Sequence, residues 1–264
     1  MGIDFERGAK VAGSKFYFMT GQEAWREWSL ITRMIEYHRA HGWTFVIPPY
    51  LVNEKTAERA GILPRFDGQF YAMPEDGLIA IPTAETPLVG MHSDEIIPAK
   101  DLPLRYVAFS PCFRREAGAG GQRDRGLKRV HQFHKVELFV ICQPEHSAEM
   151  HAEMVAYVCR MIDDLFPGLI YRKVDLPDWD RSPVSTSTID IELLVDGEWL
   201  EVSSISNMGD NQSRPAQIRF KNKRGKNEKV HMLNGSALAL PRLTLALEQL
   251  KPPGFPTHRN EGEE

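Results

Sequence analysis

The sequence has few cysteines and no long apolar run, and these absences limit what the protein can be. Its three cysteines, Cys112, Cys142 and Cys159, are widely spaced and odd in number. This argues against a disulfide framework and against a paired-cysteine zinc site. No apolar stretch is long enough to span a bilayer, and the first ten residues lack the apolar core of a signal peptide. The expected setting is therefore reducing and cytoplasmic.

An excess of positive charge is also absent. The 264 residues include 32 Lys and Arg against 36 Asp and Glu, which gives a formal net charge of −4. Long-range attraction to nucleic acid is therefore not a property of the whole surface. With 42% apolar and 26% charged residues, the composition is that of a globular protein with one large core.

The pattern of apolar residues predicts an α+β domain, with many antiparallel strands and helices at the flanks. Helical spacing marks residues 22–41 and 147–165, and a last helix is expected after Gly235. Pro48-Pro49 interrupts a short strand, which suits a sheet edge or a subunit boundary. Hairpin turns are predicted at Glu75-Asp76-Gly77 and Asp196-Gly197. Residues 1–250 show no internal boundary, and 251–264 are predicted to form a flexible tail.

One stretch, CFRREAGAGGQRDRGLKRVHQFHKVEL (residues 112–138), is rich in Lys and Arg but also carries glutamates. Strands are predicted on either side of its Gly-rich loop, at 104–116 and 129–142. Side chains alternate along a strand, so residues of equal parity share a face. A hairpin would therefore present two arginines, two glutamates and an aromatic ring on one surface: Arg114, Glu116, Arg129, Phe133 and Glu137.

Such a surface could bind a nucleotide together with an amino acid. Arginine forks bind phosphate or carboxylate, an aromatic face can stack on a base, and a carboxylate accepts hydrogen bonds from ammonium or amine groups. Two alternatives remain open: a solvated hairpin with ion pairs on its outer face, or a nucleic-acid stripe, which the carboxylates disfavour. His131 and His134 should point to opposite faces, so a two-histidine zinc site is not expected.

The segment FRREAGAGGQRDRGLKRVHQFHKVE resembles motif 2 of class II aminoacyl-tRNA synthetases, in the form used by seryl-tRNA synthetases. Five further segments resemble that family in order and spacing: GIDFERGAKVAGSKFYFMTG, IPTAETPLVGMH, LPLRYVAFSPCFRREAG, EVSSISNMGDNQSR and LNGSALALPR. The resemblance covers residues 2–250. It implies the class II antiparallel sheet flanked by helices, in a catalytic domain that is usually homodimeric through its first helix and the Pro-Pro strand.

The resemblance also implies activation of L-serine with ATP to give seryl-adenylate and pyrophosphate, without zinc. The expected ATP-binding residues are Arg114, Glu116, Arg129, Phe133, Glu201, Ser204 and Arg242, with Arg114, Arg129 and Arg242 catalytic. The expected serine-binding residues are Thr83, Glu85, Arg114, Glu137, Asn234 and Ser236. Mg²⁺ that bridges the phosphates would be held by Glu201 and Ser204.

Parity supports some of these assignments and conflicts with others. Thr83 and Glu85 share parity, but Glu201 and Ser204 do not, and only a β-bulge or a strand end would bring them to one face. Thr83 and Ser236 are also residue types that commonly cap helices. If the predicted strand register holds, Cys112 is expected to lie on the opposite face from the residues around Glu137. A zinc site in the pocket would need a cysteine there, so this also argues against zinc.

The chain departs from the family in several places. It carries no heptads for the coiled-coil arm that binds tRNA, the stretch expected as Gln-Ala-Arg-Arg is Gln212-Ser213-Arg214-Pro215, and Ile205 replaces a cysteine. The favoured hypothesis is transfer of serine to a carrier protein or small molecule. The alternatives are the catalytic core of an authentic serine–tRNA ligase and a non-enzymatic paralogue that binds a nucleotide or a partner. The basic turn at 219–229 is predicted to be a solvated hairpin tip rather than a binding surface.

Overall fold

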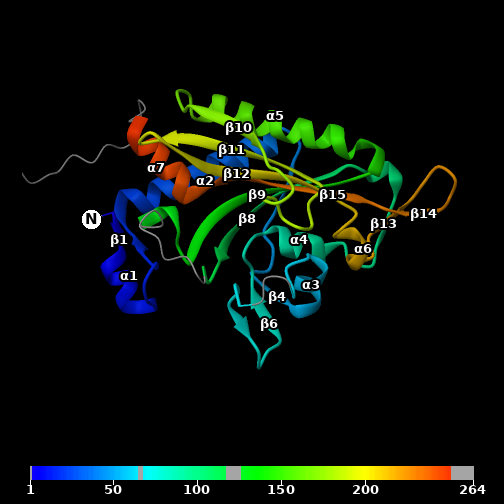
Figure 1. The fold of residues 1–264 in the computed structure, drawn as a ribbon, viewed down its shortest axis with the longest axis horizontal. Coiled ribbons are helices and arrows are strands. Elements are labelled where there is room, and N and C mark those ends of the chain that lie inside the picture. Colours follow the sequence, from blue (N-terminus) through cyan, green and yellow to red (C-terminus); the bar gives the residue numbers. More distant parts are fainter. Residues whose placement is uncertain (1, 65–67, 117–125, 251–264) are drawn as a thin grey trace, which may run out of the picture.

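The computed structural model describes residues 2–64, 68–116 and 126–250. The predicted tail, 251–264, and the Gly-rich segment 117–125 lie outside the described residues. A seven-stranded sheet forms the centre of the fold (Figure 1), in the order β10-β11-β12-β15-β9-β8-β3. Its strands are β3 (Thr44–Val46), β8 (Leu104–Phe113), β9 (Gln132–Cys142), β10 (Tyr171–Asp175), β11 (Ser187–Val195), β12 (Glu198–Gly209) and β15 (His231–Ala239). All neighbours pair antiparallel except β3 with β8.

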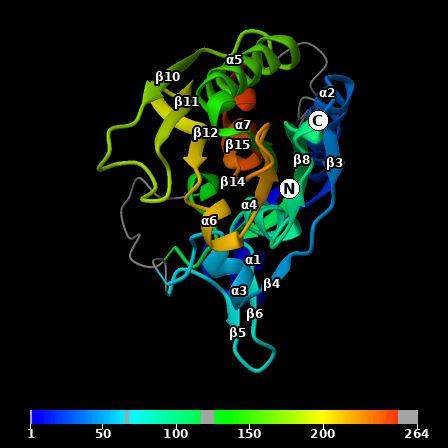
Figure 2. The same cartoon turned by 90° about the vertical axis from the view of Figure 1, so that its right-hand side faces the viewer.

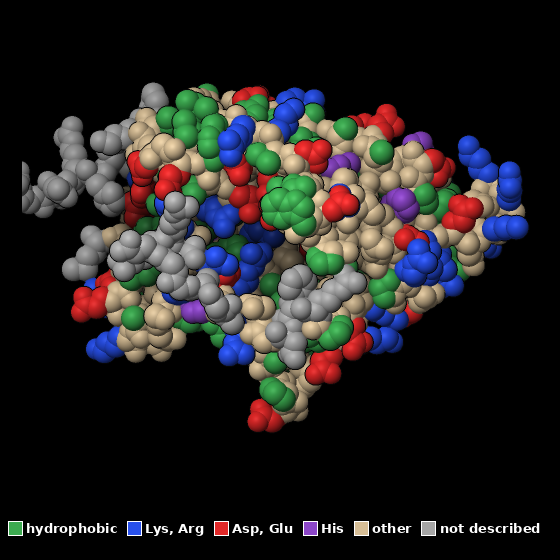
Figure 3. Space-filling model, viewed as in Figure 1, with side chains coloured by type: hydrophobic (Ala, Val, Ile, Leu, Met, Phe, Trp, Pro, Cys, Tyr) green, Lys and Arg blue, Asp and Glu red, His purple; other side chains and the backbone are tan. Residues whose placement is uncertain are grey.

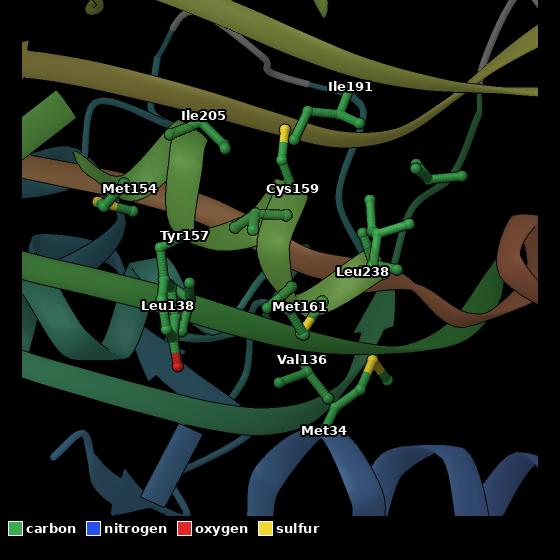
Figure 4. Close-up of a cluster of buried hydrophobic side chains, with 14 of the residues drawn as sticks. Met34, Val136, Leu138, Met154, Tyr157, Cys159, Met161, Ile191, Ile205 and Leu238 are labelled. Carbon is green, nitrogen blue, oxygen red and sulfur yellow. The ribbon is translucent and has the colours of Figure 1, made fainter. Parts of the chain in front are cut away.

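Three helices pack on one face of this sheet: α2 (Gly21–Ala40), α5 (Ser147–Leu165) and α7 (Leu240–Leu250). The apolar stripe of α5 meets the even-numbered side chains of β9, such as Val136 and Leu138 (Figure 4). Met161 and Ile162 are completely buried there. Burial of each such side chain contributes about 1.5–3 kcal/mol. Side chains alternate along a strand, so the odd-numbered side chains of β9 lie on the opposite face of the sheet.

Smaller elements gather on that opposite face and at the N-terminal end (Figure 2). A sheet of β4 (Leu51–Asn53), β5 (Ala72–Met73) and β6 (Leu78–Ala80) lies near α3 (Glu54–Arg59) and α4 (Glu85–Met91), and α4 packs against β9. A third sheet joins β7 (Ile96–Ile97), β13 (Arg219–Lys221) and β14 (Asn227–Lys229), beside the short helix α6 (Ser213–Ala216). At the N-terminus β1 (Ile3–Asp4) pairs with β2 (Phe18–Met19), and α1 (Phe5–Ala12) lies between them in sequence.

The α+β prediction is confirmed, as are the two long helices and both hairpin turns. The short strand before Pro48-Pro49 is β3, the edge of the large sheet, as its proline pair suggested. The last helix is wrong in position: residues 235–239 continue β15, and α7 starts at Leu240. The hairpin around Glu75-Asp76-Gly77 ends with β6 at Ala80, and Glu85 begins the helix α4, so strand parity does not relate Thr83 to Glu85. No helix among the described residues is long and apolar enough to cross a membrane.

Candidate active site

The β8–β9 hairpin builds one wall of the site. Cys112 pairs with Phe133 and Ala108 with Glu137, and beyond the strand the Arg114 amide donates to the His131 carbonyl at 2.9 Å. This register places Arg114 on the face of Phe133 and Glu137, so the predicted shared face is confirmed. The Arg114 guanidinium lies 5.2 Å from the centre of the Phe133 ring.

Beyond the strand ends, two predicted ATP-binding side chains contact each other. Arg129 Nε lies 2.5 Å from Glu116 Oε2. The Glu116 carboxylate is largely shielded, whereas the Arg129 side chain remains partly exposed. The same hairpin therefore supplies both cationic and anionic groups to the site.

A β-bulge in β12 resolves the parity conflict between Glu201 and Ser204. Glu201 pairs with Glu192 and Ser203 with Ile191, which leaves Val202 without an opposite residue. The extra residue reverses the alternation, so Glu201 and Ser204 share a face, and both line the same cavity. A β-bulge was one of the two features that would resolve the conflict; the other was a strand end.

Strand β15 and helix α7 supply the remaining predicted residues. Ser236 lies opposite Glu137 in the sheet, and Asn234 occupies the same face two residues earlier. Arg242, near the start of α7, donates to the Glu201 carbonyl at 2.6 Å and lies 3.4 Å from the Glu201 carboxylate.

These side chains surround two adjoining cavities, of about 290 and 620 Å³. The smaller one is lined by Phe133, Glu116 and the three predicted catalytic arginines, and the larger by the six predicted serine-binding residues. Six residues line both: Arg114, Glu116, Arg129, Lys135, Glu201 and Ser236. Figure 3 shows a hollow in this face with Lys and Arg side chains inside it. All twelve predicted site residues are thus brought together.

The larger cavity contains a network of carboxylates and hydroxyls. Thr83 Oγ1 donates to Glu137 Oε2 at 3.1 Å and accepts from the Glu85 amide at 3.3 Å. Thr83 therefore supports the first turn of α4 and also contacts the sheet. Desolvation and the nearby Glu137 carboxylate raise the pKa of Glu85 to about 7. The hydrogen bond from Gln212 acts in the opposite direction and lowers this pKa.

Three residues at the site were not predicted. Lys135 is buried, forms an ion pair with Glu137 and lines both cavities. Its parity with Phe133 and Glu137 was a signal that could have identified it. Gln212 contacts Glu85, from which it is separated by 127 positions in the sequence. The only sequence signal for Gln212 was its place in a stretch that resembles a family motif. Asp190 pairs opposite Ser204, and burial raises its pKa to about 6.

The prediction that Cys112 lies off this face is wrong. Its pairing with Phe133 places it on the face of Lys135 and Glu137, because register across the hairpin, not parity within one strand, decides the matter. The thiol is completely buried, and burial raises its pKa. Among the residues the structure describes, no three His, Cys, Asp or Glu side chains gather as a metal site.

The oxygen donors of Glu201 and Ser204 nevertheless suit Mg²⁺, which is usually bound by one or two protein groups together with substrate phosphates. Both residues line the larger cavity. Asp190 Oδ1, opposite Ser204, is buried without a hydrogen-bond partner.

The basic turn at 219–229 forms the β13–β14 hairpin, and none of its residues lines either cavity.

Comparison with known proteins agrees with this geometry. The family model for the "tRNA synthetase class II core domain (G, H, P, S and T)" matches residues 70–250. The serine–tRNA ligase of Chlamydia abortus is 45% identical over 250 residues, and that of Methylacidiphilum infernorum is 46% identical over 248. Each alignment covers 93% of this chain but 58% of the relative.

Solved structures give the same result. The structure of seryl-tRNA synthetase from Pyrococcus horikoshii complexed with ATP matches with a TM-score of 0.89 and 40% identity, over 93% of this chain and 55% of that one. A Giardia lamblia prolyl-tRNA synthetase in complex with prolyl-adenylate matches with a TM-score of 0.79 at 19% identity, which indicates the fold alone. The chain spans 58% of the length of the two serine–tRNA ligases and about half that of the two solved structures.

Proposed function

The chain belongs to the class II tRNA synthetase core family, and from this premise we propose that it activates L-serine with ATP, giving seryl-adenylate and pyrophosphate. The observation that carries the proposal is the pair of adjoining cavities. Phe133 and Arg242 line only the smaller cavity, which suits a nucleotide. The residues Thr83, Glu85, Glu137 and Asn234 line only the larger one, which suits a small hydroxy-amino acid. Arg114 lies where they meet.

The adenine ring would stack on Phe133, and its amino group would donate to the Glu116 carboxylate. In the free protein Glu116 contacts Arg129, so nucleotide binding would part them. Arg129 and Arg242 would then bind the γ-phosphate of a bent ATP. Mg²⁺, when bound by Glu201 and Ser204, would neutralise phosphate charge.

The reaction needs no nucleophile from the protein. The serine carboxylate attacks the α-phosphorus in line, a new carboxyl–phosphorus bond forms, and the bond to the pyrophosphate oxygen breaks. Arg114 would contact both the carboxylate and the α-phosphate, stabilising the negative charge that develops between them. Catalysis then comes from positioning and charge stabilisation.

Serine would be held by its ammonium and hydroxyl groups. Thr83, Glu85 and Glu137 supply acceptors on one side, and Asn234 and Ser236 complete the pocket from β15. A site that binds a hydroxyl discriminates strongly against alanine, because its polar groups would be left unpaired.

For the acceptor, we propose tRNA. The hypothesis of a carrier protein or small molecule depended on the absence of an arm in this sequence, and neither the site nor the relatives support it. The relatives at about 45% identity are named serine–tRNA ligases, which supports the alternative of a serine–tRNA ligase core. A non-enzymatic role is disfavoured because every predicted catalytic residue lines the cavities.

We also propose that the protein is a homodimer. Trp25 and Trp28 on α2 are 64% and 53% exposed, and Ile47, just after the edge strand β3, is 69% exposed. Large apolar side chains in such numbers typically mark an interface. Light scattering should give a molecular mass about twice that of one chain. A mass equal to that of one chain at micromolar concentration would contradict the proposed homodimer.

The experiment that tests the activity is ATP–pyrophosphate exchange with each of the twenty amino acids in the presence of Mg²⁺. Exchange with serine alone is the expected result. Exchange with another amino acid would reject the pocket assignment, and no exchange by folded, ATP-binding protein would favour the non-enzymatic paralogue. Charging of tRNA with labelled serine then tests the acceptor.

A further inference from the structure

Gln212 is completely buried beside the larger cavity. It immediately precedes α6, and its side-chain Nε2 donates to two acceptors from other parts of the fold. One is the Ala60 carbonyl at the end of α3, at 3.0 Å, and the other is Glu85 Oε1 at the start of α4, at 2.6 Å. Its own Oε1 is buried without a hydrogen-bond partner.

The orientation of this amide follows from its neighbours. Both nearby groups are oxygen acceptors, so the NH₂ end must face them and the carbonyl end is left unpaired. A buried polar atom without a partner is unfavourable. The arrangement leaves one amide oxygen unpaired and places a donor against the Glu85 carboxylate.

The two carboxylates of the cavity have different partners. Glu137 contacts the Lys135 ammonium and accepts from Thr83, so much of its charge is already neutralised. Glu85 instead contacts a neutral amide donor. When it is ionised, its charge is therefore not neutralised by a directly bonded protein cation, and it can be offered to a cationic group in the cavity.

We propose that Gln212 is a positioning residue for the serine site: its amide holds the Glu85 carboxylate ionised and oriented, so that the second oxygen receives the ammonium group of L-serine. This inference rests on the proposed function and assigns a role to a residue outside the twelve predicted ones.

The charges around Glu85 give this role a measurable signature. Its pKa of about 7 results from desolvation and from Glu137, and it is lowered by Gln212, Lys135 and Arg114. The nearby cations of α3 and α6 are engaged elsewhere, Arg59 with Asp94 and Arg214 with Asp210. An ammonium substrate needs ionised Glu85, so kcat/KM for serine should rise as the pH increases through about 7.

The test compares Gln212→Met with the wild type in serine-dependent ATP–pyrophosphate exchange between pH 6 and 8.5. Methionine is similar in size but cannot donate, so the rise in kcat/KM should move upward by about one pH unit, with KM for serine about fivefold higher at pH 7. The KM for ATP should be unchanged. Gln217→Met, which makes the same substitution at an exposed position five residues later, should behave as the wild type.

If Gln212→Met fails to fold, Gln212→Glu provides the same test, because a second carboxylate beside Glu85 should displace the profile further upward. A profile identical to that of the wild type in a folded variant would overturn the inference. So would an equal loss at every pH with a higher KM for ATP, which would indicate a structural role. Absence of serine-dependent exchange in the wild type would instead reject the proposed function.

Discussion

Lys135 and Glu137 lie two residues apart on one face of β9, and their side chains form an ion pair where the two cavities meet. Both are buried, with 7% and 2% of their surface exposed. Alternation along the strand brings them to the same face, and the apolar opposite face of β9 holds the strand in register. A buried pair of this kind is sensitive to the loss of either partner.

Lys135→Met should destabilise the protein by about 3–5 kcal/mol, because it leaves the Glu137 carboxylate buried without its cation. Urea denaturation at pH 7.5 measures the change. The double variant Lys135→Met/Glu137→Gln should recover much of the loss, since no unpaired charge then remains. Equal destabilisation of the single and double variants would show that packing, not charge, accounts for the effect.

Arg129→Ala should raise the KM for ATP at least tenfold, because a charge-assisted contact to a phosphate contributes about 1.5–3 kcal/mol. The KM for serine should change far less. Pyrophosphate exchange at varied ATP concentration measures both. Arg105→Ala is the matched control, since Arg105 pairs with Glu153 on the other face of the sheet. An unchanged KM for ATP in Arg129→Ala would contradict its assignment to the nucleotide.

Glu85→Gln should make the protein more stable above pH 7 while it impairs the use of serine. The pKa of Glu85 is raised from 4.5 to about 7 in the fold, so its contribution to stability is fully present below pH 4.5 and is lost as the pH rises through 7. We expect a gain of about 3 kcal/mol at pH 8 and none at pH 4.5. Thermal unfolding of both proteins between pH 4.5 and 8 measures this gain. A gain of equal size at every pH would contradict the prediction.

His38→Gln should make the protein less sensitive to acid. Burial lowers the pKa of His38 from 6.5 to about 3, so the folded state holds it neutral and its stabilising contribution is lost as the pH falls below 6.5. Each pH unit below that value costs the wild type about 1.4 kcal/mol, which the variant avoids. His41→Gln is the control variant, because His41 is an exposed histidine at the C-terminal end of the same helix, α2. Parallel acid-unfolding curves for the wild type and His38→Gln would refute the prediction.

Local periodicity predicted a large part of the site. That Phe133 and Glu137 share a face followed from alternation, because pleating is a property of each strand by itself. The parity conflict between Glu201 and Ser204 required either a β-bulge or a strand end, and the structure has a bulge at Val202. These inferences succeeded because the residues concerned are close in sequence and share one strand or one hairpin.

The sequence by itself therefore determined the α+β class, the long helices and the alternation of side chains within β9. Only the tertiary structure decided that Cys112 shares the face of Glu137, that β15 continues through Ser236, and that Glu85 begins a helix. It alone brought Gln212 to Glu85. The physical reason is the range of the interactions: alternation acts between neighbours along the chain, whereas strand register and helix packing depend on segments that meet only when the core assembles.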